Sequence, residues 1–336
     1  MTAPLKLERS QVTVFGGSGF LGRHLVQRLA ATGAVVRVAV RDPLDAGFLK
    51  PLGDVGQIVP MAADIAVDTD VAAAVAGADA VVNLVGILSE TRRRTFQEIH
   101  HRAAGRVAAA AAAAGAKRLV HVSALGANKA SESAYARTKA LGEEAVLAAF
   151  PDATILRPSV IFGPEDHFFN TFAAIARLSP VVPVFGASPT LTFAPGQLPK
   201  VKLFGKGGPK FQLVYVGDVA EAIMRALESA DAAGKRYELG GPRAYSFKEV
   251  LDLVLKEIGR PRILVPVPLA LLAIKAAALE LFGIKLITRD QVRLLKRDNV
   301  VGRKALTFAD LGIQPKTVEI ILPTYLDRFR RRTRSV

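Results

Sequence analysis

The feature that most constrains this chain is a set of three glycines, every third residue, after its first apolar run. Gly16, Gly19 and Gly22 follow the apolar residues 12–15, and an amphipathic segment begins at Phe20. This order is typical of a buried strand, a tight turn and a helix N-terminus. Glycine permits the sharp turn and a close approach to the backbone, while free amides and the helix dipole favour an anion. We therefore predict a site for the pyrophosphate of a dinucleotide at this turn.

The first 160 residues alternate between strand-like and helix-like patterns. We predict strands at residues 11–15, 35–40, 57–60, 80–85, 117–122 and 153–157. We predict helices at residues 20–32, 68–76, 95–114 and 133–149. This alternation predicts an α/β fold with a doubly wound parallel sheet of the Rossmann type.

The regular alternation ends after Pro158, which predicts two domains. Residues 1–162 would form the dinucleotide-binding Rossmann domain, and residues 163–336 a smaller, mostly helical C-terminal lobe. The lobe contains a proline- and glycine-rich insert at residues 187–210 and a basic tail at residues 328–334. Ligands of open α/β sheets bind at the carboxyl ends of the strands, so we expect a cleft between the domains.

Helix signals recur in the lobe. We predict helices there at residues 167–178, 219–228 and 247–258. Asp218 would cap the second of these, and Ser246 with Glu249 forms a capping box at the start of the third. Thr288 with Gln291 has the same pattern and opens a further helix.

Composition and charge exclude several kinds of function. The chain of 336 residues has no cysteine, which excludes disulfides, thiolate nucleophiles and cysteine-ligated clusters. Its histidines do not have the spacing of a zinc site, so we predict no metal. The net charge is +15, and residues 251–336 hold seventeen Lys or Arg against eight Asp or Glu. Such a surface suits anionic lipid or an acidic protein, whereas no aromatic-interleaved basic motif supports nucleic acid.

The apolar segments predict no passage through a membrane. The start of the chain lacks the pattern of a secretory signal peptide, and the longest apolar run, residues 263–274, is too short for a transmembrane segment. Residues 269–282 are apolar around most of a helix circumference. A partner protein, the lobe's own core or a lipid interface could bury such a helix. We expect an intracellular protein, or one attached to a membrane only at its surface.

The end of the second strand indicates which dinucleotide is bound. An acidic side chain at this place binds the ribose 2′-hydroxyl of NADH. Arg41 lies here instead, and a guanidinium matches the 2′-phosphate of NADPH. Arg23, just past the third glycine, would add to the positive charge. NADPH is therefore favoured over NADH; in the alternative, Arg41 is simply exposed and Asp42 bonds the ribose.

A second group of polar residues follows the fifth predicted strand. Tyr135 and Lys139 lie four residues apart and share a helix face. An ammonium beside a phenol stabilises the phenolate and lowers the pKa of the tyrosine toward the range of a general acid or base. Ser123, at the end of the strand, would bond a substrate carbonyl. The alternative is an ordinary tyrosine and lysine on a helix surface, because this spacing is common by chance.

The order of the predicted strands places two further groups of residues near the dinucleotide. Asp64, after the third strand, either touches the adenine or is only a turn residue, and residues 83–86 would run along the cofactor. The residues predicted to line the dinucleotide are Gly16, Gly19, Phe20, Leu21, Gly22, Arg23, Arg41, Asp64, Ile65, Leu84, Val85, Gly86, Ser123, Tyr135, Lys139 and Pro158.

These residues together resemble a known family. The glycine turn with Ser123, Tyr135 and Lys139 resembles the short-chain dehydrogenase/reductase superfamily, in its extended or atypical branch. The resemblance narrows to the nucleotide-binding accessory subunits of respiratory complex I (NADH:quinone oxidoreductase) at residues 155–170, 214–223, 288–300 and 311–325. It extends over nearly the whole chain, and its C-terminal part is more specific than the superfamily motifs.

The resemblance implies a subunit that holds NADPH tightly without known turnover. It implies partners among the subunits of the hydrophilic arm, near the membrane surface and the quinone site, which in bacteria is the cytoplasmic face of the inner membrane. Three features depart from the family pattern: Ser123 precedes Tyr135 by only twelve residues, Phe15 stands where threonine is common, and the insert is longer. A soluble NAD(P)H-dependent reductase, epimerase or dehydratase of the same superfamily is the alternative, because its three polar residues are intact.

Overall fold

The computed structural model describes residues 4–192, 200–281 and 288–330, and its contacts divide the chain into two compact units. The first unit comprises residues 1–158, 216–239 and 301–315. The second comprises residues 159–215, 240–300 and 316–336. This differs from a single division at residue 162, because two later segments return to the first unit and extend its sheet and helix layers.

A seven-stranded parallel sheet forms the centre of the first unit, in the order β13-β6-β5-β4-β1-β2-β3. Its strands are β1 (Gln11–Phe15), β2 (Val35–Val40), β3 (Ile58–Ala62), β4 (Ala80–Asn83), β5 (Arg118–Val122), β6 (Thr154–Pro158) and β13 (Arg236–Leu239). The strand order reverses between β1 and β4, so the predicted doubly wound sheet is confirmed. The seventh strand, β13, was not predicted, since its four residues are too short for a periodic signal.

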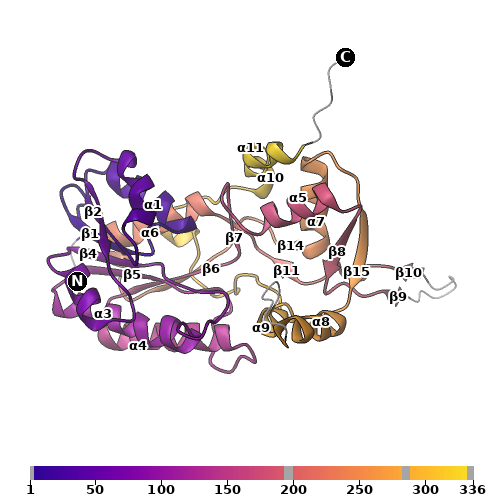
Figure 1. The fold of residues 1–336 in the computed structure, drawn as a ribbon, viewed down its shortest axis with the longest axis horizontal. Helices are drawn as coiled ribbons and strands as arrows, with labels where there is room; N and C mark the ends of the chain where they lie inside the picture. The colour runs from indigo at the N-terminus through magenta and orange to yellow at the C-terminus, as the bar shows by residue number, and fades with distance from the viewer. Residues whose placement is uncertain (1–3, 193–199, 282–287, 331–336) are drawn as a thin grey trace, which may run out of the picture. The chain divides into compact units, whose positions relative to one another are not determined.

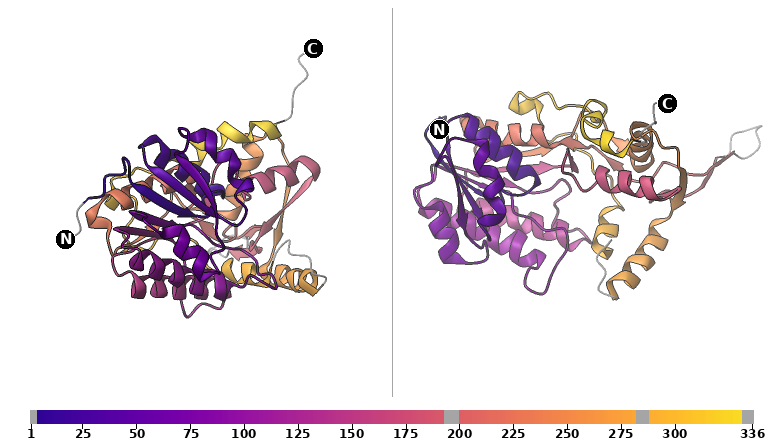
Figure 2. Two further views of the ribbon diagram at one scale, coloured as in Figure 1. Left: turned by 60° about the vertical axis from the view of Figure 1, so that its left-hand side comes forward. Right: turned by 45° about the horizontal axis from the view of Figure 1, so that its top comes forward.

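Helices cover both faces of this sheet (Figures 1 and 2). They are α1 (Phe20–Ala31), α2 (Asp68–Val75), α3 (Ala103–Ala113), α4 (Ala134–Ala149) and α6 (Val216–Glu228). α1 packs beside α6 on one face, while α2, α3 and α4 lie on the other. Because α6 begins at Val216, Asp218 lies in its first turn and does not cap it as predicted. Gly142 lets α4 approach the π-helical turn Gln97–Arg102, since a Cβ there would lie 1.9 Å from the His100 carbonyl oxygen.

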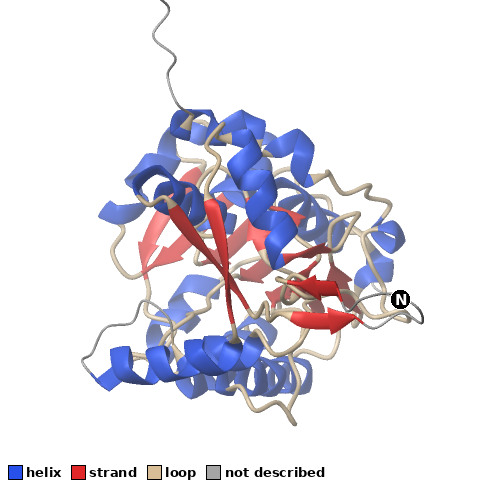
Figure 3. Ribbon diagram, turned by 90° about the vertical axis from the view of Figure 1, so that its right-hand side faces the viewer, coloured by secondary structure: helices blue, strands red, loops and turns tan. Residues whose placement is uncertain are grey.

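The second unit is built from short paired strands and helices (Figure 3). Its strands are β7 (Ile161–Phe162), β8 (Val181–Phe185), β9 (Thr190–Thr192), β10 (Lys200–Lys202), β11 (Lys210–Phe211), β12 (Val214–Tyr215), β14 (Tyr245–Ser246) and β15 (Ile263–Val267). Its helices are α5 (Phe169–Leu178), α7 (Phe247–Glu257), α8 (Leu269–Leu281), α9 (Arg289–Leu294), α10 (Val318–Ile321) and α11 (Pro323–Leu326). The chain also forms 3-10 segments at Leu44–Leu52, Ala230–Ala232, Ala309–Leu311 and Asp327–Phe329.

The core of the second unit is aromatic. Phe162, Phe169 and Phe247 are fully buried, and the rings of Phe172 and Phe247 meet edge to face with centroids 5.3 Å apart. The lobe that the sequence predicts as mostly helical therefore also contains four two-stranded sheets. These strands are two to five residues long, too short for hydrophobic periodicity to reveal them.

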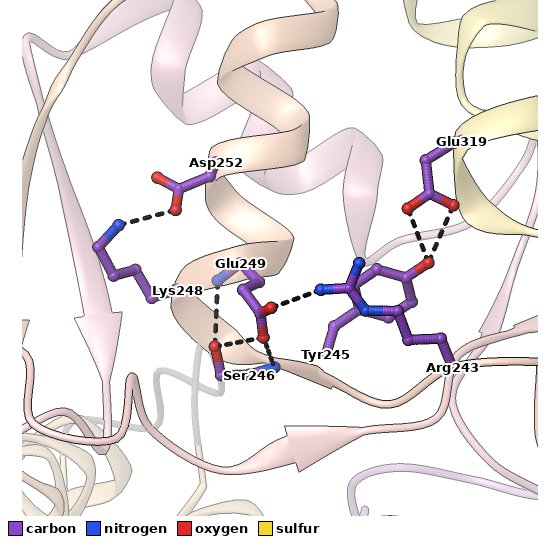
Figure 4. Close-up of polar contacts among 7 residues, drawn as sticks. All are labelled: Arg243, Tyr245, Ser246, Lys248, Glu249, Asp252 and Glu319. Carbon is purple, nitrogen blue, oxygen red and sulfur yellow. Dashed lines mark hydrogen bonds and ion pairs between the residues drawn. The ribbon is translucent and has the colours of Figure 1, made fainter.

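Both predicted capping boxes are confirmed. At the start of α7 the Ser246 hydroxyl accepts a hydrogen bond from the Glu249 amide, and the Glu249 carboxylate accepts one from the Ser246 amide (Figure 4). Thr288 and Gln291 do the same for α9. Beside α7, the Tyr245 hydroxyl donates to Glu319, so α10 is bonded to the strand that precedes α7.

The segments predicted to meet partners are described only in part. Residues 193–199 of the insert and 331–334 of the basic tail lie outside the described residues. The insert contains the antiparallel hairpin of β9 and β10. On α8, Leu272 is buried against the unit's own core, whereas Leu271 is exposed. In the part of the chain that the structure describes, no helix has the length and apolar character needed to cross a bilayer.

Candidate dinucleotide-binding site

The glycine turn between β1 and α1 has the shape of a phosphate cradle. Gly16 has φ +79°, a conformation that favours glycine, and its carbonyl oxygen accepts the Gly19 amide at 3.1 Å. A Cβ on Gly22 would lie 2.4 Å from that same oxygen, so only glycine lets the helix approach the turn. α1 begins with Gly19 as its N-cap and with no side-chain cap, which leaves its first amides to an anion. The residues therefore fit a pyrophosphate.

The side chains next to this turn differ in polarity. Phe15 and Leu21 are buried, so neither offers a hydroxyl or other polar group. The guanidinium of Arg23 lies 5.0 Å from the centre of the Phe48 ring, a cation–π contact that holds the arginine near the first turn of α1. Phe20 stacks edge-on against His24.

The end of β2 presents Arg41 to solvent. Arg41 and Asp42 are both exposed directly after the strand. The Asp42 Oδ1 accepts a hydrogen bond from the Leu44 amide at 2.9 Å, so one carboxylate oxygen is already used in a local turn. Arg41 is therefore the better placed of the two side chains to meet a 2′-phosphate.

Asp64 has the geometry of a turn residue. Its Oδ1 accepts the Ala66 amide at 3.0 Å, and its Oδ2 accepts from Arg94 at 2.9 Å. Ile65 is buried in the core of the first unit. Of the two interpretations of Asp64, the structure thus supports the turn. Arg94, which pairs with it, was not singled out from the sequence.

The segment after β4 connects the glycine turn with α4. The Leu84 amide bonds the Phe15 carbonyl, and a Cβ on Gly16 would lie 3.3 Å from Val85. A Cβ on Gly86 would lie 3.2 Å from the Lys139 Nζ atom. Residues 84–86 therefore run from the phosphate turn to the predicted nicotinamide side.

Lys139 and Tyr135 lie on one face of α4, in a desolvated setting. Lys139 Nζ donates to the Val122 carbonyl at 3.2 Å, and burial lowers the pKa of this lysine to about 8, partly offset by Glu143. The Tyr135 ring meets the rings of Phe96 and His100 edge-on, at 5.8 and 5.1 Å. Desolvation raises the pKa of Tyr135 to about 12. The sequence predicted a lowered pKa for this phenol; here the cost of charging a desolvated phenol outweighs any help from the lysine.

Ser123 makes a buried hydrogen bond that the sequence did not predict. Its hydroxyl donates to Oε1 of Glu143 at 2.5 Å, and both side chains are buried. Glu143 also accepts two hydrogen bonds of 2.8 Å from Arg157 and one ion pair of 3.0 Å from Arg236. Sequence reasoning missed Glu143, although Tyr135, Lys139 and Glu143 recur every four residues on one face of the helix. Pro158, which ends β6, accepts the Leu125 amide through its carbonyl.

Two buried histidines flank Lys139 and were also missed. His100 Nε2 accepts the Ile87 amide at 3.0 Å, so Nδ1 carries the proton and faces the Thr138 hydroxyl at 3.2 Å. Burial, then the charge of Lys139, lowers the pKa of His100 to about 2 and that of His121 to about 3. Both imidazoles are therefore neutral at pH 7. Among the described residues, no three His, Asp or Glu side chains are grouped as metal ligands would be.

Comparisons with known proteins identify the family of the chain. A model of the NAD dependent epimerase/dehydratase family matches residues 12–240. The chain is 36% identical to NADH dehydrogenase (ubiquinone) 1 alpha subcomplex subunit 9, mitochondrial, of Arabidopsis thaliana, over 95% of this chain and 78% of that protein. It is 32% identical to the NADH-ubiquinone oxidoreductase 40 kDa subunit, mitochondrial, of Neurospora crassa, over 95% of this chain and 79% of that protein.

The chain belongs to the family of these subunits, within the NAD dependent epimerase/dehydratase family. The resemblance predicted from the sequence is thereby confirmed. Among solved structures, MoeE5 in complex with UDP-glucose and NAD is similar with a TM-score of 0.69 at 18% identity, over 95% of this chain and 98% of that one, which shows the shared fold. The family's description supports a nicotinamide dinucleotide as the class of cofactor.

Proposed function

We propose that this chain is an accessory subunit of respiratory complex I that binds NADPH as a structural ligand and does not turn it over. The observation that carries the proposal is the contrast between two neighbouring parts of the site. The glycine turn retains a complete backbone cradle, whereas the Ser123 hydroxyl is bonded to the buried carboxylate of Glu143. The relatives named above, which are NADH dehydrogenase subunits, support the assembly role.

The residues of the turn would hold the dinucleotide mainly through its phosphates. Gly16, Gly19 and the first amides of α1 would bind the pyrophosphate. Tyr135 and Lys139 would lie on the nicotinamide side, where a bound nicotinamide ring supplies a hydride donor or acceptor. Tyr135 keeps its proton at pH 7, because its pKa is about 12, and the Ser123 proton is directed at Glu143. These residues orient a ligand without offering a ready proton relay.

The choice of NADPH over NADH rests on Arg41, an exposed guanidinium at the end of β2. Arg41→Glu should weaken NADPH binding roughly 10- to 100-fold, the value of a charge-assisted hydrogen bond, and should change NADH binding little. Isothermal titration of the full chain with each dinucleotide measures this. Equal losses for the two dinucleotides would remove the 2′-phosphate assignment.

We further propose where the protein acts. Its partners would be the subunits of the hydrophilic arm near the quinone site, and its attachment to the membrane would be peripheral, on the cytoplasmic face of the inner membrane in a bacterium. The second unit would also contact anionic lipid. Native fractionation of gently solubilised membranes tests this placement. Co-migration of the chain with NADH:quinone reductase activity at very high mass supports it, and a soluble monomer or dimer refutes it.

Two variants separate the structural role from catalysis. Tyr135→Phe removes the hydroxyl of the only tyrosine in the predicted site and should leave NADPH content and assembly unchanged. Gly19→Asp places a negative charge against the pyrophosphate and should abolish both. If Tyr135→Phe instead abolishes an NADPH-dependent reduction found in a substrate screen, the alternative of a soluble reductase, epimerase or dehydratase replaces the subunit role. The lowered pKa of Lys139, about 8, is the observation that favours this alternative.

A further inference from the structure

The second unit contains two long stretches of sequence without a carboxylate. No Asp or Glu occurs in residues 167–215 or in residues 258–279. The same stretches contain five lysines and three arginines. A surface built from them is positively charged throughout and attracts anions over a range set by the ionic strength.

The fold brings the two stretches together. β8 pairs with β15 in parallel, with Val181 opposite Ile263. The hairpin of β9 and β10 follows β8 in the chain, and α8 follows β15. At the base of the hairpin, a Cβ on Gly186 would lie 3.4 Å from the side chain of Leu269, the first residue of α8. The hairpin of the first stretch and the helix of the second therefore adjoin at their bases.

Large aliphatic side chains are exposed in and after β10, on β15 and on α8. Exposed fractions lie between 53% and 69% for Val201, Leu203, Ile263, Leu271 and Ile274. On α8 the opposite side is buried, with Leu272 and Ala276 packed toward Val292, so the helix is held with an aliphatic face outward. Exposed large aliphatic side chains on adjoining segments point to a binding surface.

Exposed lysines neighbour these aliphatic side chains in the sequence. Lys202 is between Val201 and Leu203 in the sequence, and Lys275 follows Ile274. A lysine can bury its hydrocarbon stem along an apolar surface while its ammonium reaches a phosphate group. Segments that carry both exposed aliphatic and exposed cationic side chains suit the boundary between acyl chains and anionic headgroups.

The composition of this surface indicates which kind of partner binds it. Protein–protein interfaces are depleted in lysine, whereas anionic bilayers favour it. A second copy of the chain would bring cations against cations with no carboxylate from either stretch to pair them. An anionic bilayer is therefore the occupant that fits best.

We propose that the lysine–aliphatic surface, residues 201–206 and 271–275, binds the surface of an anionic lipid bilayer. The aliphatic side chains would enter the headgroup–acyl boundary, and the lysines would pair with lipid phosphates. The proposal rests on the proposed function, which places the chain beside a membrane, and it names the surface that meets the lipid.

The test is co-sedimentation of the NADPH-loaded full chain with vesicles. One set contains phosphatidylcholine alone, and the other contains phosphatidylcholine with about one third phosphatidylglycerol. We expect binding to the anionic vesicles that weakens as salt is raised, and little binding to the neutral ones. Lys202→Gln with Lys206→Gln should weaken anionic binding about 30-fold, at roughly fivefold for each lysine. Leu271→Ser with Ile274→Ser should weaken it at least about tenfold.

Matched control variants change the same residue types elsewhere. Lys235→Gln with Lys304→Gln alters two exposed lysines of the first unit, and Val55→Ser with Ile320→Ser alters two exposed aliphatic residues. Both controls should bind vesicles like the unchanged chain. Circular dichroism and NADPH content are measured for every variant, so a folding defect is detected separately from lost lipid binding.

Two results would overturn the proposal. One is a chain that does not sediment with anionic vesicles, or that sediments equally with neutral ones. The other is a loss in the surface variants no larger than in the controls. If vesicles are not bound but Lys202→Gln with Lys206→Gln abolishes co-migration with complex I, an acidic protein is the partner and the proposed function stands. If vesicles are bound but the chain never co-migrates with complex I, the proposed function fails and the lipid surface stands.

Discussion

The buried carboxylate of Glu143 should be one of the most sensitive positions in the first unit. Its side chain is 1% exposed and accepts hydrogen bonds from Ser123 and, through both oxygens, from Arg157. Arg236 is its third partner, at 3.0 Å. One charge on α4 thus connects β5, β6 and β13. Glu143→Gln keeps the shape of the side chain but leaves two guanidinium groups facing a neutral amide.

The expected loss follows from burial. Removing one partner of a buried ion pair costs about 3–5 kcal/mol, because the remaining charge is left uncompensated. Arg236 is 43% exposed, so water can take over part of its interaction. We therefore expect a loss of about 3 kcal/mol in the free energy of unfolding. For a domain of this size that corresponds to a fall of roughly 6–12 °C in Tm.

Urea unfolding followed by circular dichroism measures this loss. Glu144→Gln is the matched control, since the Glu144 side chain is 53% exposed and pairs with Lys129 at the surface. The control should change stability by less than about 0.5 kcal/mol. A loss below about 1 kcal/mol for Glu143→Gln, or one equal to the control, would refute the argument that this network holds the strands and Ser123 in place.

Three further predictions concern the turn, a helix cap and pH. Gly22→Ala should lower the free energy of unfolding by about 1–3 kcal/mol in thermal unfolding, and should remove most NADPH binding in a titration, because its Cβ would meet the Gly16 oxygen. Gly47→Ala is the control, since Gly47 has open space around it. Equal effects of the two substitutions would contradict the steric argument. Ser246→Ala should cost about 1 kcal/mol through loss of the α7 cap; a neutral result in urea unfolding would show that the cap is not needed. The pKa of His100 is lowered in the folded protein to about 2, so His100 contributes its full stabilisation above the unfolded pKa of 6.5. This stabilisation is progressively lost as the pH falls from 6.5 toward about 2. His121, whose pKa is lowered to about 3, acts in the same direction. The free energy of unfolding, measured with urea at pH 7.5 and 5.5, should therefore fall below pH 6.5 by about 1.4 kcal/mol per pH unit for each of the two histidines, and His100→Gln should remove about half of that dependence.

Most of the first unit could be predicted because its signals are local. A fully buried parallel strand is a short apolar run, and the helices that cross over between strands have their own periodicity. The glycine turn is local too, since Gly16, Gly19 and Gly22 lie within seven residues. Capping boxes at Ser246 and Thr288 could be found for the same reason, because both partners lie within four residues.

The second unit and the last strand were harder to predict. β13 and the paired strands of the second unit are too short for periodicity, and their partners lie far away in the chain. α6 was expected in the lobe, but it packs beside α1 in the first unit. Sequence order does not show when a chain returns to an earlier domain, because the return depends on which apolar faces of that domain are not yet covered by a helix or strand.

The sequence by itself determined the Rossmann sheet, the phosphate turn and the family, since each depends on residue types in a short window. Only the tertiary structure decided what the polar residues do. It turned Ser123 toward Glu143, placed Asp64 in a turn and desolvated Tyr135 so that its pKa rises. Those outcomes depend on burial and on partners from other strands and helices. Because desolvation and charge pairing are set by all the groups that surround a side chain in space, no motif read along the chain could supply them.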